Sequence, residues 1–261
     1  MSDGISGFIA ELPRKKQRGS LPRCLAMTSG DDIDVARTIT ALVSHHASIV
    51  PGKHGWAPRG FEETREHQLH SSPLLPVSVR TELADWWFAV KSARANSPNW
   101  DLIAQCTIGG KEGLILVEAK AHDAELKAAG KALTSKSNMQ NHKRIRSAIE
   151  EARVALEGLR PGWSISIDTH YQLANRFAWS WALASRGIPV VLLYLGFTNA
   201  KEMTSEGEPI RDDAHWAQIL DDYGRGVVPS DIWINPLVIG DTPLIALRRT
   251  LPIDLPGGNP A

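Results

Sequence analysis

The sequence has few cysteines and no excess of charge of either sign. Only Cys24 and Cys106 occur among 261 residues. A framework of several disulfides is therefore excluded, and we expect a reducing compartment such as the cytoplasm. Lysine plus arginine and aspartate plus glutamate number 29 each, so the formal net charge is zero. This balance argues against a protein coated in positive charge, but it leaves room for a local basic patch.

Long apolar runs are also missing. No stretch approaches the length of about 20 apolar residues that a membrane-spanning helix needs, so we expect no membrane partner. The N-terminal residues lack the apolar core of a secretory signal. Glycine, serine and proline surround a basic run at residues 14–18, and we expect residues 1–33 to be a mobile tail. The same run also has the composition of a nuclear address or of an arm that binds nucleic acid.

Helical and strand-like patterns alternate along the rest of the chain. Apolar residues at helical spacing predict helices over residues 34–46, from 77 onward, and over 138–159, 169–187 and 212–222. Apolar runs bounded by glycine or proline predict strands over residues 100–108, 113–121, 188–197 and 242–251. Residues 34–261 contain no repeat and no evident linker. We therefore predict a single α/β domain with a central mixed sheet flanked by helices.

One predicted strand ends in an unusual way. Its apolar run, residues 114–117, is followed by Glu118 and Lys120, which point to the same face of an extended strand. If this strand pairs with the preceding one through the turn at residues 109–110, Asp101 comes to lie near both. Two close carboxylates repel each other unless a cation lies between them, and carboxylate oxygens are ligands that Mg²⁺ prefers. The sequence thus predicts a site for metal-assisted phosphodiester hydrolysis.

The motifs PNWD, ending at Asp101, and EAK, starting at Glu118, resemble those of the PD-(D/E)XK nuclease superfamily. The later passage YQLANRFAWSWALASRGIPVVLLYLGF is similar to uncharacterised bacterial proteins of that fold. The resemblance implies a restriction-endonuclease-like core. It also implies that Asp101, Glu118 and the main-chain carbonyl of Ala119 bind Mg²⁺ or Mn²⁺. Lys120 would support the attacking water.

The resemblance extends to two flanking helices. Many members of the superfamily carry a glutamate on the helix before the metal strands, and Glu82 occupies a corresponding place. Many carry a glutamine on the following helix, where Tyr171 and Gln172 match. Arg176 lies one helical turn after Gln172 on the same face, so both side chains can reach one site. Gln172 would hold Lys120 or the substrate, with Glu82, Tyr171 and Arg176 in support.

A basic helix face offers a surface for the substrate. The cations that could grip a phosphate backbone are Lys136, Lys143, Arg144 and Arg146. These observations predict a nuclease that acts on DNA, and a homodimer remains open because cutting both strands often needs two copies. A nucleic-acid-binding protein that retains the fold without cutting, and a purely structural domain, are the alternatives.

Each candidate residue also has an ordinary structural interpretation. Glu118 and Lys120 would then form a salt bridge at a strand end, and Asp101 would cap the turn after a proline. Glu82 and the basic residues would form solvated helix faces. Gln172 and Arg176 would make structural hydrogen bonds within an apolar helix.

Overall fold

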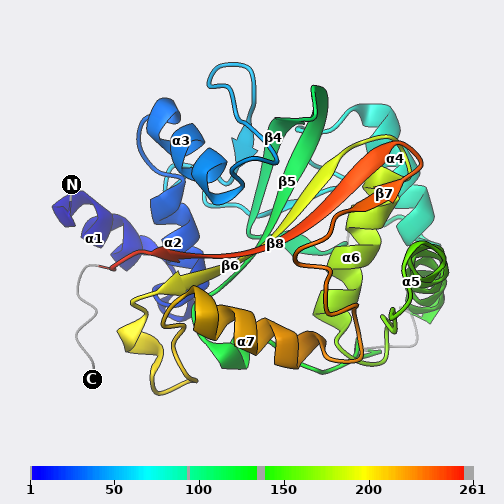
Figure 1. Ribbon diagram of the computed structural model, residues 1–261. Helices are drawn as coiled ribbons and strands as arrows, with labels where there is room; N and C mark the ends of the chain where they lie inside the picture. The colour runs from blue at the N-terminus through cyan, green and yellow to red at the C-terminus, as the bar shows by residue number, and fades with distance from the viewer. Residues whose placement is uncertain (1, 93–94, 134–138, 256–261) are drawn as a thin grey trace.

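A hairpin of two strands forms part of the main sheet of the fold (Figure 1). The computed structural model describes residues 2–92, 95–133 and 139–255. Strands β4 (Leu102–Ile108) and β5 (Lys111–Lys120) pair antiparallel across Gly109 and Gly110. Both glycines have positive φ angles, +56° and +83°, as a two-residue hairpin turn of this twist requires. The turn therefore lies at residues 109–110, as the sequence predicts.

Four further strands complete a six-stranded mixed sheet in the order β1-β4-β5-β6-β8-β7. Strand β6 (Val190–Thr198) lies parallel to β5, and β8 (Thr242–Pro252) lies parallel to β6. The short strands β1 (Trp56–Ala57) and β7 (Leu237–Ile239) pair antiparallel at the two edges. The predicted α/β class with a mixed central sheet is confirmed.

Helices cover both faces of this sheet. The α-helices are α1 (Ser2–Glu11), α2 (Ser20–Met27), α3 (Asp32–Leu42), α4 (Val77–Trp87), α5 (Met139–Leu159), α6 (Tyr171–Ala184) and α7 (Asp213–Gly224). Within the described residues, 3₁₀ turns occur at η1 (Arg14–Lys16), η2 (Asp123–Glu125) and η4 (Lys201–Met203). Among the described residues, no helix combines the length and the apolar character that crossing a membrane demands.

The apolar run of β5 is explained by burial on both sides. Leu114 and Leu116 belong to a core shared with α4, α5, α6 and α7. Ile115 and Val117 belong to a second core shared with α2 and α3. A strand covered on both faces needs apolar residues at every position rather than at alternate ones.

The N-terminal segment differs from the predicted mobile tail. Helix α2 contributes Cys24 to the core on one face of the sheet. Arg23 is fully buried and donates two hydrogen bonds to the Glu202 carboxylate, at 2.6 and 3.0 Å. The prediction of a tail over residues 1–33 is wrong for this helix, because apolar burial and a buried ion pair attach it to the rest of the fold.

The strand predicted over residues 100–108 is interrupted. Strand β3 (Asn99–Trp100) pairs with β2 (His67–Gln68) in a separate two-stranded sheet, and β4 begins only at Leu102. Asp101 lies between these two strands. Its position at the junction of two sheets leaves its side chain beside the end of β5.

Candidate active site

The end of β5 gathers the polar residues of the site. Asp101 directly precedes Leu102, the residue at which β4 begins its pairing with β5, and its carboxylate contacts the main chain of Ala119. Glu118 lies on the face of the sheet that α6 covers, where it meets Gln172 and Arg176. Lys120 lies two residues further along β5 on that same face. The strand order of the hairpin therefore brings the three predicted catalytic side chains together.

Glu118 is the centre of this group, with only 1% of its surface exposed. Gln172 donates from Nε2 to Oε1 of Glu118 at 2.6 Å, and Lys120 donates from Nζ to the same oxygen. Arg176 donates from Nε to Oε2 at 2.5 Å. Both carboxylate oxygens are thus engaged, two of their three donors being cationic, which offsets the cost of burying the charge.

Helix α6 supplies Gln172 and Arg176 from successive turns of one face. Arg176 is itself buried, and its other groups are occupied. Its Nη2 donates to the carbonyl of Asn99 at 2.7 Å, and its guanidinium lies 4.3 Å from the centre of the Trp100 ring. The helix, the β2–β3 sheet and β5 are therefore joined at this one side chain.

The charges around Glu118 decide the protonation states. Burial raises the pKa of Glu118, but the positive charges of Arg176 and Lys120 more than offset this, so its pKa lies below the usual range. Burial lowers the pKa of Lys120, yet the charges of Glu118 and Asp101 leave it above its usual value. Lys120 is therefore a charged donor at neutral pH. It cannot act as a general base in this state.

The pKa of Asp101, in contrast to that of Glu118, is raised. Burial, followed by the charge of Glu118, raises the pKa of Asp101 from 3.8 to about 7, although Lys120 opposes this. Its Oδ2 accepts a hydrogen bond from the main-chain N–H of Ala119 at 2.7 Å. A carboxyl group that is partly protonated at neutral pH ionises readily when a cation binds beside it.

This shift predicts how stability depends on pH. Because the folded pKa lies above the unfolded value, the contribution of Asp101 is present in full below about 3.8 and is lost as pH rises to about 7. Without divalent metal, Asp101→Asn should therefore stabilise the protein more at pH 8 than at pH 5.5. Urea unfolding of both proteins in EDTA measures this difference. A difference that does not change with pH would contradict the raised pKa.

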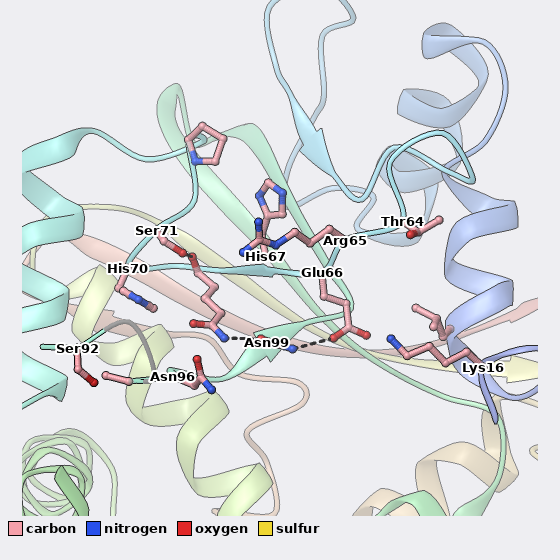
Figure 2. Close-up of a pocket in the computed structure, with 14 residues that line it drawn as sticks. Lys16, Thr64, Arg65, Glu66, His67, His70, Ser71, Ser92, Asn96 and Asn99 are labelled. Atoms are coloured by element: carbon pink, nitrogen blue, oxygen red, sulfur yellow. Dashed lines mark hydrogen bonds between the residues drawn. The ribbon is translucent and has the colours of Figure 1, made fainter. Parts of the chain in front are cut away.

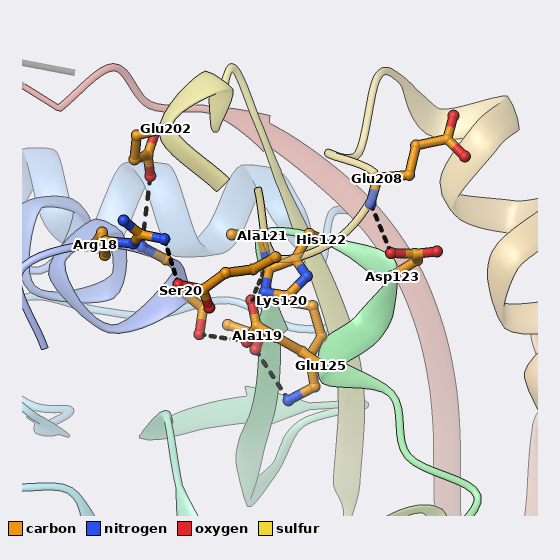
Figure 3. Close-up of polar contacts among 12 residues, drawn as sticks. Arg18, Ser20, Ala119, Lys120, Ala121, His122, Asp123, Glu125, Glu202 and Glu208 are labelled. Atoms are coloured by element: carbon orange, nitrogen blue, oxygen red, sulfur yellow. Dashed lines mark hydrogen bonds and ion pairs between the residues drawn. The ribbon is translucent and has the colours of Figure 1, made fainter. Parts of the chain in front are cut away.

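A pocket of about 480 Å³ opens above these side chains. Its ionisable lining consists of four carboxylates and two cations: Glu66, Asp101, Glu118, Glu125, Lys120 and Arg176. When all are ionised, four negative and two positive charges leave an excess of two negative charges. Figure 3 shows Glu125 beside the end of β5, where it accepts hydrogen bonds from the Ser20 hydroxyl and the Ala121 N–H. A divalent cation would neutralise this excess.

Glu66 and Glu125 were not predicted from the sequence. Glu125 follows the end of β5 by five residues, and an acid so close to a strand end is a signal that was available. Glu66 precedes β2 in a loop with several acids and no periodic pattern, so no local signal singles it out. Asn99 connects Glu66 to the site by donating to its carboxylate at 3.1 Å (Figure 2).

The donor set suits a hard cation that keeps several of its waters. Mg²⁺ is commonly bound through one or two carboxylates and substrate phosphates rather than by a complete protein cage. Among the described residues no group of three or more acidic, histidine or cysteine side chains forms such a cage. Asp101 fits this role best, since only its Oδ2 is engaged by a described residue. At Glu118 a cation would replace the Lys120 or Gln172 donor on Oε1.

The structure brings together Asp101, Glu118, Lys120, Gln172 and Arg176. The carbonyl of Ala119, predicted as a metal ligand, accepts a hydrogen bond from Nζ of Lys120 at 3.2 Å.

Two predicted supporting residues lie elsewhere. Glu82 is exposed and pairs at 3.1 Å with Arg186, which follows the end of α6 opposite to Gln172. The reason is that α4 buries Leu83 and Trp87, which turns Glu82 toward solvent. Tyr171 faces the Lys131 ammonium, 4.9 Å from its ring centre, instead of lining the pocket.

The predicted basic helix face also lies away from the pocket. Lys143, Arg144 and Arg146 are on α5, and none of them lines the site. Arg146 forms an ion pair with Asp168, with one hydrogen bond of 2.7 Å. Lys136 lies outside the described residues. Helix α5 packs against α4 and α6 through its apolar stripe, so its basic residues face outward on the far side of α6.

Comparisons with models of protein families, with curated proteins and with solved structures found no match to this chain.

Proposed function

We propose that this chain is a metal-dependent nuclease of the PD-(D/E)XK type, with a restriction-endonuclease-like core, that hydrolyses phosphodiester bonds in DNA. The proposal is carried by one observation. Asp101, Glu118 and Lys120 converge in a single pocket that is lined by four carboxyl groups and two cationic groups. Such a pocket suits Mg²⁺ or Mn²⁺ together with a phosphate.

Each side chain of the site has a separate role in the proposed reaction. Asp101 and Glu118 would hold the ion, which, when bound, polarises the phosphoryl group and lowers the pKa of a water. Lys120 keeps its proton and donates to the attacking water or to the charge that develops on the phosphate. Arg176 and Gln172 fix the Glu118 carboxylate by hydrogen bonds to its two oxygens. These two are positioning residues.

A second candidate is a nucleic-acid-binding protein that does not cut. The observation in its favour is the saturation of Glu118, whose oxygens already accept from Lys120, Gln172 and Arg176. If these donors are not exchanged for metal, the site is a stable ion-pair network inside the fold. Measuring whether the protein cleaves the DNA that it binds then distinguishes a nuclease from a protein that only binds.

Incubation with plasmid and linear DNA tests the proposal directly. We expect cutting in Mg²⁺ or Mn²⁺ and none in EDTA, because the pocket's uncompensated acids need a cation before a phosphate can approach. Purified protein that binds DNA but never cuts it, with either metal, would support the second candidate instead.

The setting proposed for this activity is the cytoplasm. Both cysteines, Cys24 and Cys106, are free and buried, as suits a reducing compartment. A homodimer would allow both strands of a duplex to be cut, and measuring the mass in solution with and without DNA tests this.

A further inference from the structure

Three cavities meet at the candidate site. A pocket of about 720 Å³ shares Glu66, Gln68, Asn96 and Asn99 with it. A second neighbour of about 630 Å³ shares Ser20 and Glu125 with the site. The two neighbours also share Lys16 and Leu21 with each other. The three cavities are therefore adjacent, and together they will be called the groove; Glu118 and Lys120 line the smallest of them.

Unpaired cations lie along the rim of this groove. Arg14, Lys15 and Lys16 line the second neighbour, and Arg65 lines the first. All four are exposed, and none forms an ion pair with any residue in the described ranges. Figure 2 shows Lys16 extending from the N-terminal segment into the larger pocket. Cations that no acid neutralises are available to a ligand of negative charge.

Residues 14–18 carry three of these cations, Arg14, Lys15 and Lys16, and will be called the basic turn; contacts with the rest of the fold hold this segment in place. Gln17 donates from Nε2 to the carbonyls of Ala10 and Leu12, at 3.1 and 2.7 Å. Arg18 forms an ion pair with Glu206. The adjoining helix α2 is fixed by the buried Arg23, which donates to the Glu202 carboxylate. The basic turn is thus a built surface beside the site.

The chemistry of the groove selects among anionic ligands. Its centre is acidic and its rim is basic. An anionic ligand would therefore contact the cations of the rim, and a bound divalent cation would separate it from the acids of the centre. The larger pocket offers the side-chain amide of Asn96, which suits the hydrogen-bonding edge of a base, whereas Gln68 already donates to Asn99 and Asn99 to Glu66. A strand of nucleic acid presents both a repeating phosphate and such edges. An acidic peptide presents negative charge but no base edges for this amide.

We infer that the basic turn binds the phosphate backbone of the nucleic-acid strand that the site acts on, and that this turn, not helix α5, is the main electrostatic contact. This inference rests on the proposed function. It assigns Lys15 and Lys16 to phosphate contacts next to the reacting phosphodiester. The larger pocket holds the adjoining nucleotides.

The test compares two matched pairs of charge removals. Lys15→Gln/Lys16→Gln removes two adjacent cations from the basic turn. Lys143→Gln/Arg144→Gln removes two adjacent cations from α5, which line none of the three cavities. Binding to fluorescein-labelled 20-nucleotide DNA and RNA, single-stranded and duplex, is measured by anisotropy over a range of NaCl in Ca²⁺, a hard cation with oxygen ligands that offsets the acidic lining of the site. Comparing the four probes shows whether the protein prefers DNA or RNA, and a single strand or a duplex.

We expect the change in the basic turn to weaken binding about tenfold or more at low salt. It should also lower the slope of log affinity against log salt by about 0.7–0.9 for each cation removed. The α5 pair should change affinity less than about twofold. Equal losses in the two variants, unchanged binding by Lys15→Gln/Lys16→Gln, or equally tight binding of a labelled polyglutamate would each overturn the inference. So would wild-type protein that binds none of the four nucleic-acid probes.

Cutting assays keep this inference separate from the proposed function. Binding that depends on the basic turn, in a protein that never cuts, contradicts only the nuclease activity. If cutting requires metal and Lys120 but Lys15→Gln/Lys16→Gln leaves the affinity for nucleic acid unchanged, only the inference is contradicted.

Discussion

Replacing Lys120 by alanine is expected to slow DNA cutting by at least about 100-fold. The ammonium is the charged donor that faces the pocket, and a positioned donor to a reacting group typically contributes about 10²–10⁴ in rate. Asp101→Asn should lower the rate by a similar factor, since it removes the carboxylate that fits a cation best. Initial rates in Mg²⁺ and in Mn²⁺ give the comparison.

The control for this prediction lies on the same strand. Lys111, at the opposite end of β5, is exposed and pairs with Asp241 at 2.8 Å, so Lys111→Ala should leave the rate unchanged. Circular dichroism of each variant checks that the fold is retained. Folded Lys120→Ala protein that cuts as fast as wild type would eliminate the catalytic assignment.

Replacing Arg176 by methionine is expected to lower the free energy of unfolding by about 3 kcal/mol. Removing one partner of a buried ion pair typically costs about 3–5 kcal/mol, because the other charge stays buried. Lys120 still compensates Glu118, which sets the expected value at the lower end. Arg176→Met also removes the bond to the Asn99 carbonyl. Urea unfolding near pH 7 measures the loss.

Two further variants serve as controls for the Arg176→Met measurement. Glu82→Gln removes an exposed ion pair with Arg186 and should cost less than about 1 kcal/mol. The double variant Glu118→Gln/Arg176→Met has no buried carboxylate at position 118 that lacks its Arg176 partner. Its loss of unfolding free energy should therefore be smaller than the sum of the losses of the two single variants. An Arg176→Met protein as stable as Glu82→Gln would show that the buried network contributes little.

The long elements of the fold were predictable from the sequence because each has enough residues to show a period. Strands β4, β5, β6 and β8 and helices α3 to α7 all occur where the apolar pattern places them. Strands β1 and β7 contain two and three residues, too few to display alternation. Helix α2 was missed because Gly19 and Pro22 resemble chain breakers. Proline is tolerated there, since N–H groups in the first helical turn have no partner within the helix.

The candidate site was predictable where a local rule fixed the geometry. Side-chain alternation along β5 and the hairpin register bring Asp101, Glu118 and Lys120 together. The four-residue spacing on α6 brings Gln172 and Arg176 to the same point. Glu66 reaches the site through tertiary packing of a loop, which no local period encodes. The prediction for Glu82 failed because the apolar face of α4 fixes the helix rotation and directs this residue outward.

The order of strands across the sheet has a consequence for association between molecules. The longest strands, β5, β6 and β8, are interior, and each border is closed by β1 or β7, with two or three residues. Another polypeptide seeking to extend the sheet would find few unpaired amides to template it. The short edge strands thereby disfavour edge-to-edge aggregation even though each central strand contains an apolar run.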